Sequence, residues 1–281
     1  MAEALFEMAR EHRKLKKIEL ADDELSRGKR ILQEAIRDFP NSDLKVQGEY
    51  LLANLAQELK KYEEGISRYS KVISNWPESE FASKSQFKKA ICLEKMNMLD
   101  KAAEEYVKVT YLYPGSDLTP DAVIRMASLY FKQKKYSVAS KIYLRFQSNY
   151  PDHKLASRAY FMAANCLIIE QKKIEAANKI LTAANDQLPE KSKKRKTLAK
   201  VSYVEAIEIL ANMVDTYKDD KKVRPEGMYW LGDCQYLNKE YTISYQTFKK
   251  LTWDYPESKW AKIARGRLTD ERFEDFEKGL E

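Results

Sequence analysis

Apolar residues recur along the chain at fixed distances from a series of aromatic–proline pairs. These pairs are Phe39-Pro40, Trp76-Pro77, Tyr113-Pro114, Tyr150-Pro151 and Tyr255-Pro256. The first four prolines are spaced 37 residues apart. Leu188-Pro189 continues the series one position later than this spacing requires. Tyr217 stands where a further unit is expected to end, but no proline follows it. A fixed period of this length indicates a protein built from stacked units.

Each unit repeats one pattern of small and large residues. A small residue lies twelve positions before each proline: Gly28, Gly65, Ala102, Ala139, Ala177 and Ser244. A large residue lies eight positions before it: Leu32, Tyr69, Tyr106, Tyr143, Leu181 and Phe248. The proline ends one helix, and a serine two positions later, as at Ser79 and Ser258, can cap the next helix. Each unit is therefore predicted to be two helices joined by a short turn. His153 replaces this serine once and is expected to be an ordinary loop residue.

The period divides the chain into seven segments and a C-terminal end. The segments are 2–40, 41–77, 78–114, 115–151, 152–189, 190–222 and 223–256, followed by a cap and charged tail in 257–281. A single helix pair leaves apolar faces exposed, and stacking of neighbouring pairs buries them. We therefore expect one all-α solenoid over residues 1–281, in which residues 190–222 form a degenerate copy.

The last segment resembles a tetratricopeptide repeat. The residues that carry the resemblance are Leu231, Gly232, Tyr241, Ser244, Phe248 and Pro256. The resemblance implies a right-handed superhelix of six to seven helix pairs, closed by a capping helix at Ser258–Leu268. The spacing of the prolines is longer than the usual period of this family, which is about 34 residues.

The Tyr-Pro-x-Ser junctions narrow the resemblance to bacterial envelope proteins. The chain is similar in style to outer-membrane assembly lipoproteins of the BamD kind and to Tol–Pal-associated proteins of the CpoB (YbgF) kind. This implies a non-enzymatic scaffold in the periplasm, with the cytoplasm as the alternative location. The chain start has no lipobox cysteine, so a lipid anchor is not carried over. We expect the chain to be part of a longer protein, and its first helix to run to about Leu20.

Composition excludes several classes of function. The 281 residues carry a formal net charge of +7, with 44% hydrophobic residues and few glycines or prolines, 8 of each. No apolar run is long enough to cross a membrane. Three cysteines and two histidines leave little material for a metal site, and no catalytic motif is present. We therefore expect no enzyme, no metal and no cofactor, and place Cys92, Cys166 and Cys234 in the core.

The run from Lys191 to Lys200 is the strongest local charge feature, with six Lys or Arg among ten residues. It supports an alternative function, binding to nucleic acid or to another anionic surface. Aromatic residues do not alternate with these cations, which weakens the case for nucleic acid.

By the resemblance, the first helix of each pair lines a concave groove for a partner. The expected partner-binding residues are Tyr50, Asn54, Phe87, Ile91, Ile124, Ser128, Phe131, Phe161, Asn165 and Tyr229. Aromatic side chains can anchor a protein or peptide segment, and Asn54, Ser128 and Asn165 share one slot from which they can hydrogen-bond its backbone. Tyr50 and Phe87 stand where co-chaperones of this family carry a carboxylate-binding lysine, which argues against binding of chaperone tails.

Overall fold

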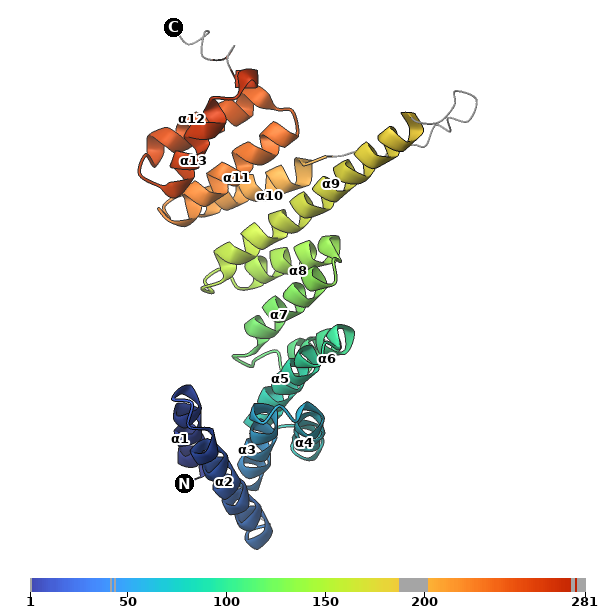
Figure 1. The fold of residues 1–281 in the computed structure, drawn as a ribbon, viewed down its shortest axis with the longest axis vertical. Coiled ribbons are helices and arrows are strands. Elements are labelled where there is room, and N and C mark those ends of the chain that lie inside the picture. The colour runs from blue at the N-terminus through green and yellow to red at the C-terminus, as the bar shows by residue number, and fades with distance from the viewer. Residues whose placement is uncertain (1, 41, 43, 187–201, 274–275, 277–281) are drawn as a thin grey trace. The chain divides into compact units, whose positions relative to one another are not determined.

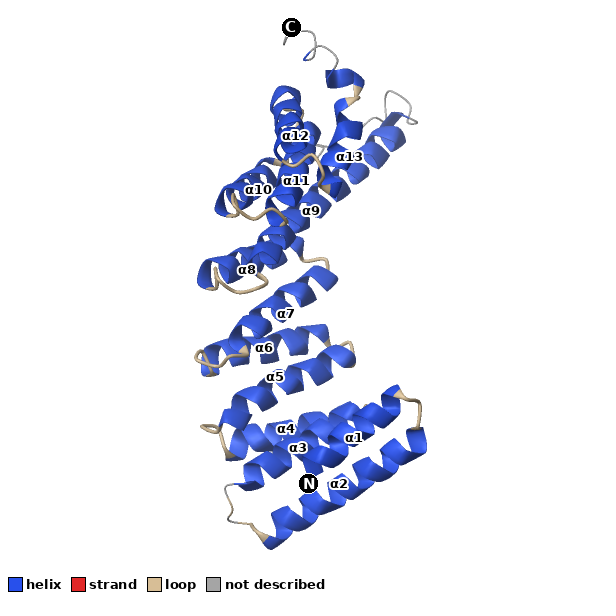
Figure 2. Ribbon diagram, turned by 90° about the vertical axis from the view of Figure 1, so that its left-hand side faces the viewer, coloured by secondary structure: helices blue, strands red, loops and turns tan. Residues whose placement is uncertain are grey.

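The computed structural model describes residues 2–40, 42, 44–186, 202–273 and 276, and these residues are helical or lie in turns and loops. These described residues form thirteen α-helices, drawn in Figures 1 and 2. They are α1 (Ala2–Lys14), α2 (Ile18–Asp38), α3 (Leu44–Glu58), α4 (Tyr62–Asn75), α5 (Glu80–Lys95), α6 (Leu99–Leu112), α7 (Thr119–Lys132), α8 (Tyr136–Asn149), α9 (Ala156–Asp186), α10 (Val204–Thr216), α11 (Val223–Leu237), α12 (Tyr241–Asp254) and α13 (Lys259–Leu268). The predicted all-α class is confirmed.

The chain forms two compact units, Met1–Leu129 and Tyr130–Glu281. In the first unit each helix from α1 to α6 packs against the next one, and α3 also contacts α5. In the second unit the helices from α8 to α13 pack in the same successive manner, and α11 also contacts α13. Within each unit, helices that are consecutive in the chain therefore pack against one another, as in a stack of helix pairs. A single continuous array over both units remains a prediction.

The turn inside a helix pair depends on one residue in the left-handed conformation. These residues are Lys16, Lys60, Asn97, Lys134 and Lys239, with φ between 59° and 67°. After α3, the amide of Lys61 donates to the carbonyl of Ala56, and that of Lys60 donates to the carbonyl of Gln57. This is a Schellman motif, which satisfies the last carbonyls of the helix and reverses the chain. The first such turn ends α1 at Lys14, so the prediction that this helix runs to about Leu20 was wrong.

The helix caps follow the predicted positions. The side chains of Ser79 and Ser258 accept backbone N–H groups of α5 and α13, at 3.0 Å in both cases. The equivalent histidine does the same, because the amide of Leu155 donates to Nδ1 of His153 at 3.2 Å. His153 therefore lies in the loop as predicted, and its imidazole nitrogen takes the place of the serine hydroxyl just before α9.

The fifth helix pair differs from the prediction. A helix pair was expected within residues 152–189, but α9 runs without a break from Ala156 to Asp186. Its second helix is α10, which packs against α9 and ends at Thr216, with Tyr217 as its C-cap residue. The interval from Tyr150 to Tyr217 is therefore nearly twice the usual period. The sequence Glu-Gln-Lys-Lys-Ile-Glu-Ala-Ala, where the turn was expected, favours a continuous helix because nearly all of these residues are good helix formers.

The small and large positions of this pair shift accordingly. Ala206 and Leu210 on α10 are buried, with 1% and 0% exposure, whereas Ala177 on α9 is exposed. Leu188-Pro189, the basic run and the side chain of Leu181 lie outside the described part of the chain. Of residues 190–222, the described part from residue 202 onward supplies the second helix of the pair that α9 begins.

Two glycines in the same repeat position are expected to respond oppositely to alanine. A Cβ atom at Gly28 would lie 2.5 Å from Cε1 of the buried Phe6, whereas at Gly65 the nearest atom is Sγ of Cys92 at 3.5 Å. In the third pair the same repeat position is occupied by an alanine, Ala102. We expect Gly28→Ala to destabilise the protein by about 1–3 kcal/mol through overpacking. Gly65→Ala should stabilise it by up to about 1 kcal/mol through helix propensity.

Chemical denaturation followed by circular dichroism measures both effects in the same unit of the protein. Equal shifts of the midpoint for the two variants would contradict this account of the small position.

Candidate partner-binding surface

In the first unit, the predicted residues lie on three first helices of the pairs. Tyr50 and Asn54 lie on α3, Phe87 and Ile91 on α5, and Ile124 and Ser128 on α7. Phe87 is buried and the others are half-buried. Their environment within the unit decides how much of each side chain remains for a partner.

Asn54 lies beside the large residue of its own pair. The Tyr69 hydroxyl donates to Oδ1 of Asn54 at 2.7 Å, and Oε1 of Gln57 lies 3.0 Å from the same hydroxyl. The ring of Tyr50 is 6.1 Å from that of Tyr69 and 5.2 Å from that of Phe81. The amide nitrogen of Asn54 makes no hydrogen bond to a described residue.

Phe87 belongs to the core of the third pair. Its ring packs edge-on against that of Tyr106, 5.5 Å away, and only 7% of the residue is exposed. The guanidinium of Arg125 covers the ring at 5.5 Å. A partner over this position would meet Arg125 before it met Phe87.

A line of charged side chains on the first helices was not singled out in the sequence. Arg10 on α1 donates from Nε to Glu58 on α3 at 2.8 Å, and Arg125 lies 3.5 Å from Glu94 on α5. Burial lowers the pKa of Lys88 on α5, and the nearby charge of Arg10 lowers it further. Lys88 and Arg125 stand one period apart, so the repeat is the signal that identifies them.

Ser128 differs from the two asparagines of its slot. Its hydroxyl donates to the carbonyl of Ile124, one helical turn earlier, at 3.0 Å. The hydroxyl proton of Ser128 is therefore used in a hydrogen bond within its own helix. It is not available for the predicted hydrogen bond to a partner backbone.

In the second unit, the predicted residues join a cluster of aromatic rings. Phe161 on α9 lies 5.9 Å from Trp230 on α11, and Trp230 lies 5.4 Å from Tyr229 and 6.1 Å from Trp260 of α13. Phe131, by contrast, packs against Tyr136 at 5.5 Å. Neither Trp230 nor Trp260 was among the predicted partner-binding residues. Trp230 lies on α11, the first helix of the next pair, and Trp260 lies on the capping helix α13.

Asn165 lies one turn after Phe161 on α9 and is half-buried. No described residue hydrogen-bonds to its side chain. Asn165 and Asn54 occupy the same slot three periods apart. Among the described residues, neither amide nitrogen at this slot has a hydrogen-bond partner.

The three cysteines are buried core residues. Burial raises the pKa of Cys92 to about 11 and the pKa values of Cys166 and Cys234 to about 12. The thiols therefore stay protonated at neutral pH, which makes them poor nucleophiles and poor metal ligands. Within the described ranges, no group of three or more His, Cys, Asp or Glu side chains could hold a metal ion.

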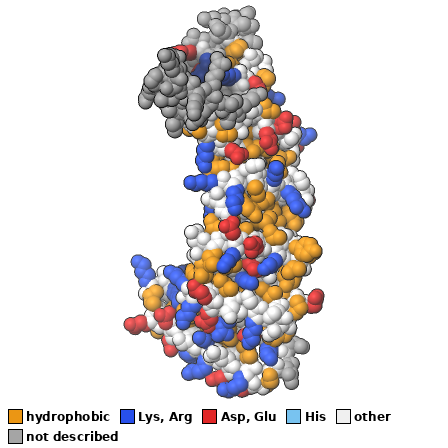
Figure 3. All heavy atoms as spheres, turned by 90° about the vertical axis from the view of Figure 1, so that its right-hand side faces the viewer, with side chains coloured by type: hydrophobic (Ala, Val, Ile, Leu, Met, Phe, Trp, Pro, Cys, Tyr) orange, Lys and Arg blue, Asp and Glu red, His pale blue; other side chains and the backbone are white. Residues whose placement is uncertain are grey.

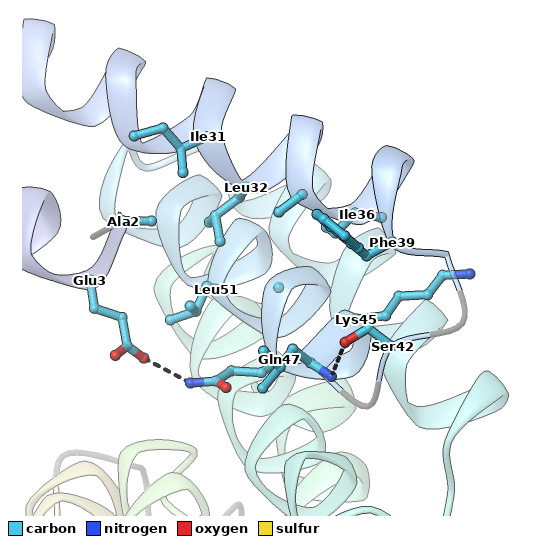
Figure 4. Close-up of a pocket in the computed structure, with 13 residues that line it drawn as sticks. Ala2, Glu3, Ile31, Leu32, Ile36, Phe39, Ser42, Lys45, Gln47 and Leu51 are labelled. Carbon is cyan, nitrogen blue, oxygen red and sulfur yellow. Dashed lines mark hydrogen bonds between the residues drawn. The ribbon is translucent and has the colours of Figure 1, made fainter.

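An apolar cavity of about 490 Å³ lies between the start of α1, the end of α2 and the start of α3 (Figure 4). Ile31, Leu32 and Leu51 line it, and at its rim Nε2 of Gln47 donates to Glu3 at 3.2 Å. None of the ten predicted partner-binding residues lines this cavity. It is therefore a separate feature of the first unit.

The surface shown in Figure 3 carries Lys and Arg side chains interspersed with Asp and Glu and with apolar patches. In the part of the chain that the structure covers, no helix combines the length and apolar character needed to cross a membrane.

Two family models match the chain. Residues 87–273 match the model described as "YfiO: Outer membrane lipoprotein", and residues 48–79 match a tetratricopeptide repeat model. These matches confirm the resemblance to tetratricopeptide repeats and to envelope proteins. No curated protein matches the chain in sequence.

Several solved structures are similar to this chain. MamA from Desulfovibrio magneticus RS-1, from residue 41 to its end, has a TM-score of 0.45 at 15% identity, covering 78% of this chain and 98% of that chain. YrrB, described as a TPR protein with an unusual peptide-binding site, has a TM-score of 0.46 at 14% identity, covering 84% and 97%. A tetratricopeptide repeat protein from Parabacteroides merdae ATCC 43184 has a TM-score of 0.43 at 12% identity, covering 94% and 98%.

Proposed function

The chain belongs to the YfiO family of outer membrane lipoproteins, and we propose that it is a non-catalytic, protein-binding scaffold of the bacterial cell envelope. The proposed location is the periplasm. We further propose that an extended or helical segment of a partner protein lies along the first helices of the pairs. No small-molecule substrate or cofactor enters this proposal.

The observation that carries the proposal is the pair of asparagines with uncommitted donors. Asn54 and Asn165 lie in one slot of α3 and α9, and neither amide nitrogen is used by the described residues. A partially buried donor without a partner loses hydrogen-bonding free energy, which a backbone carbonyl of a bound segment would restore. Amides that bind backbone carbonyls accept many sequences, as a scaffold for extended segments requires.

The aromatic cluster beside Asn165 supports the same proposal. Phe161, Tyr229, Trp230 and Trp260 are all half-buried, so each ring combines contact with its neighbours and some open surface. Such rigid, partly desolvated rings are the usual anchors of protein interfaces. Among the ten predicted residues, we therefore give most weight to Phe161, Asn165 and Tyr229 in the second unit, and to Tyr50 and Asn54 in the first.

The test is an isosteric double variant, Asn54→Asp with Asn165→Asp. Aspartate still accepts the Tyr69 hydroxyl but has no N–H donor. A protein recovered from envelope extract with the unmodified chain should bind the double variant at least about tenfold more weakly, since one lost hydrogen bond costs about 1–3 kcal/mol. Affinity is measured by calorimetry with the purified partner.

The matched control is Asn75→Asp with Asn149→Asp, which changes the charge equally. Both residues are exposed and lie at the ends of the second helices α4 and α8. Unchanged affinity of the Asn54/Asn165 variant, or equal losses in both double variants, would refute the proposed surface. Phe87→Ala is a poor test because it would also remove core packing.

The alternative function, binding of nucleic acid or an anionic surface through residues 191–200, makes different predictions. Affinity would then fall steeply with salt, and replacing Lys193, Lys194, Arg195 and Lys196 by serine would abolish binding. The scaffold proposal expects weak salt dependence and little effect of these four changes on partner binding.

A further inference from the structure

The end of the second unit carries a tryptophan that the fold does not use. Trp253 on α12 is 86% exposed, more than any other large apolar residue among those described. It stands three residues before Pro256. The same position holds Arg37, Ser74, Tyr111 and Ser148 in other pairs, so most helix pairs have no aromatic side chain there.

Cations surround this tryptophan. Lys249, Lys250, Thr252, Trp253 and Arg265 line a shallow hollow of about 510 Å³, and no carboxylate is among its lining residues. The guanidinium of Arg265 is held in place, because Nη2 donates to the carbonyl of Pro256 at 2.7 Å.

The two helices around the hollow, α12 and α13, are basic as a whole. From Tyr241 to Leu268 there are six Lys or Arg residues, and the acidic residues are Asp254 and Glu257. Ile243 on α12 and Ile263 on α13 are also about half exposed, at 49% and 47%. The region therefore combines positive charge with separate exposed apolar side chains.

We propose that the face formed by Lys250, Trp253 and Arg265 binds the surface of a membrane that contains anionic phospholipid. Tryptophan is favoured at the boundary between headgroups and acyl chains because its ring is apolar and its N–H is polar. Lysine and arginine beside it are attracted to anionic headgroups. The hollow holds a headgroup phosphate near the Lys250 ammonium and the Arg265 guanidinium while the indole ring enters the interface.

The small size of the hollow favours a lipid over an acidic protein. A stable protein interface buries about 800 Å² on each partner and uses about 20–30 residues of each. The hollow has five lining residues, flanked by single apolar side chains rather than by a continuous apolar patch. One lipid headgroup matches this scale, and a membrane presents many headgroups side by side.

Co-sedimentation with vesicles tests the proposal on the full chain. Vesicles of equal parts phosphatidylglycerol and phosphatidylcholine should bind the protein, and vesicles of phosphatidylcholine alone should not. Lys250→Ser with Arg265→Ser should reduce the partition coefficient about thirtyfold, the effect of losing two cations near an anionic surface. Trp253→Ser should also reduce it.

Tyr111→Ser is the matched control, because Tyr111 is 81% exposed and stands three residues before Pro114, in the first unit. This variant should bind vesicles like the unmodified chain. Equal loss in the Tyr111 and Trp253 variants would overturn the proposal. So would unchanged binding of the Lys250/Arg265 variant together with loss in the variant that replaces Lys193, Lys194, Arg195 and Lys196 by serine.

A soluble polyglutamate peptide separates lipid from acidic protein. If polyglutamate binds in a manner that depends on Trp253 and Lys250, and vesicles do not bind, the membrane proposal is wrong and an acidic partner replaces it. The proposal is independent of the partner-binding surface, because the Asn54/Asn165 double variant should retain vesicle binding.

Discussion

Replacing Phe248 by alanine is expected to lower the free energy of unfolding by about 3–5 kcal/mol. Phe248 is fully buried in the second unit, and its ring lies 5.9 Å from that of Tyr229 and 6.4 Å from that of Phe273. A Cβ atom at Gly232 would lie 2.7 Å from Cε1 of Phe248, so the glycine leaves room for the ring. Truncation would leave a cavity between α11 and α12 that these rigid neighbours cannot fill.

Guanidinium chloride denaturation followed by circular dichroism measures this loss. Trp253→Ala is the control on the same helix, and its exposed ring should change stability by no more than about 0.5 kcal/mol. Similar losses in both variants would contradict the assignment of Phe248 as a core residue of this unit.

Raising the pH above 9 is expected to destabilise the protein steeply. Burial raises the pKa of Cys166 and of Cys234 from 9.0 to about 12, and that of Cys92 to about 11. A thiol exposed by unfolding releases its proton near pH 9, whereas the folded protein retains it. The stabilisation is therefore complete below pH 9 and is lost as the pH rises through the folded values. Cys234 alone should account for roughly 3 kcal/mol at pH 11.

Buried tyrosines should extend the loss at higher pH. Burial raises the pKa of Tyr203 to about 12 and also raises the pKa values of Tyr69 and Tyr106. Ordinary tyrosine ionises near pH 10. The interval between pH 9 and pH 10 therefore reports mainly on the thiols.

The measurement is the free energy of unfolding between pH 7 and pH 11, compared with a variant in which the three cysteines are replaced by alanine. The variant should lose stability less steeply between pH 9 and pH 10, whatever its stability at pH 7. Thiolate absorbance in the folded protein near pH 9, or parallel stability curves for the two proteins, would contradict the prediction.

The repeat pattern predicts where the residues of the proposed surface lie, but it does not predict their hydrogen bonds. The period places Asn54, Ser128 and Asn165 in one slot, and the structure places all three half-buried on first helices. The pattern does not distinguish their hydrogen bonds, however. Ser128 bonds to its own helix because a hydroxyl can reach the carbonyl one turn earlier, whereas the amide of Asn54 accepts the Tyr69 hydroxyl of the next helix.

Phe87 and Trp230 show the same limit for aromatic residues. Phe87 is enclosed by Tyr106 and Arg125, which come from the two helices that follow α5 in the chain, α6 and α7. Trp230 reaches Phe161 of α9 across a much larger separation in sequence. Periodicity identifies the helix face of a residue, but the neighbours that cover that face belong to other helices.

The sequence by itself determined the all-α class, the helix pairs, the capping positions and the buried small and large residues of most pairs. These features depend on local rules, because proline ends a helix, serine caps one, and small and large residues meet at a fixed helical spacing. Only the tertiary structure decided the course of residues 156–186 and 204–216, where α9 continues through the expected turn and α10 supplies the second helix. A local sequence that favours helix has no signal for where the chain returns, and packing against α9 and α11 selects Ala206 and Leu210 for the core.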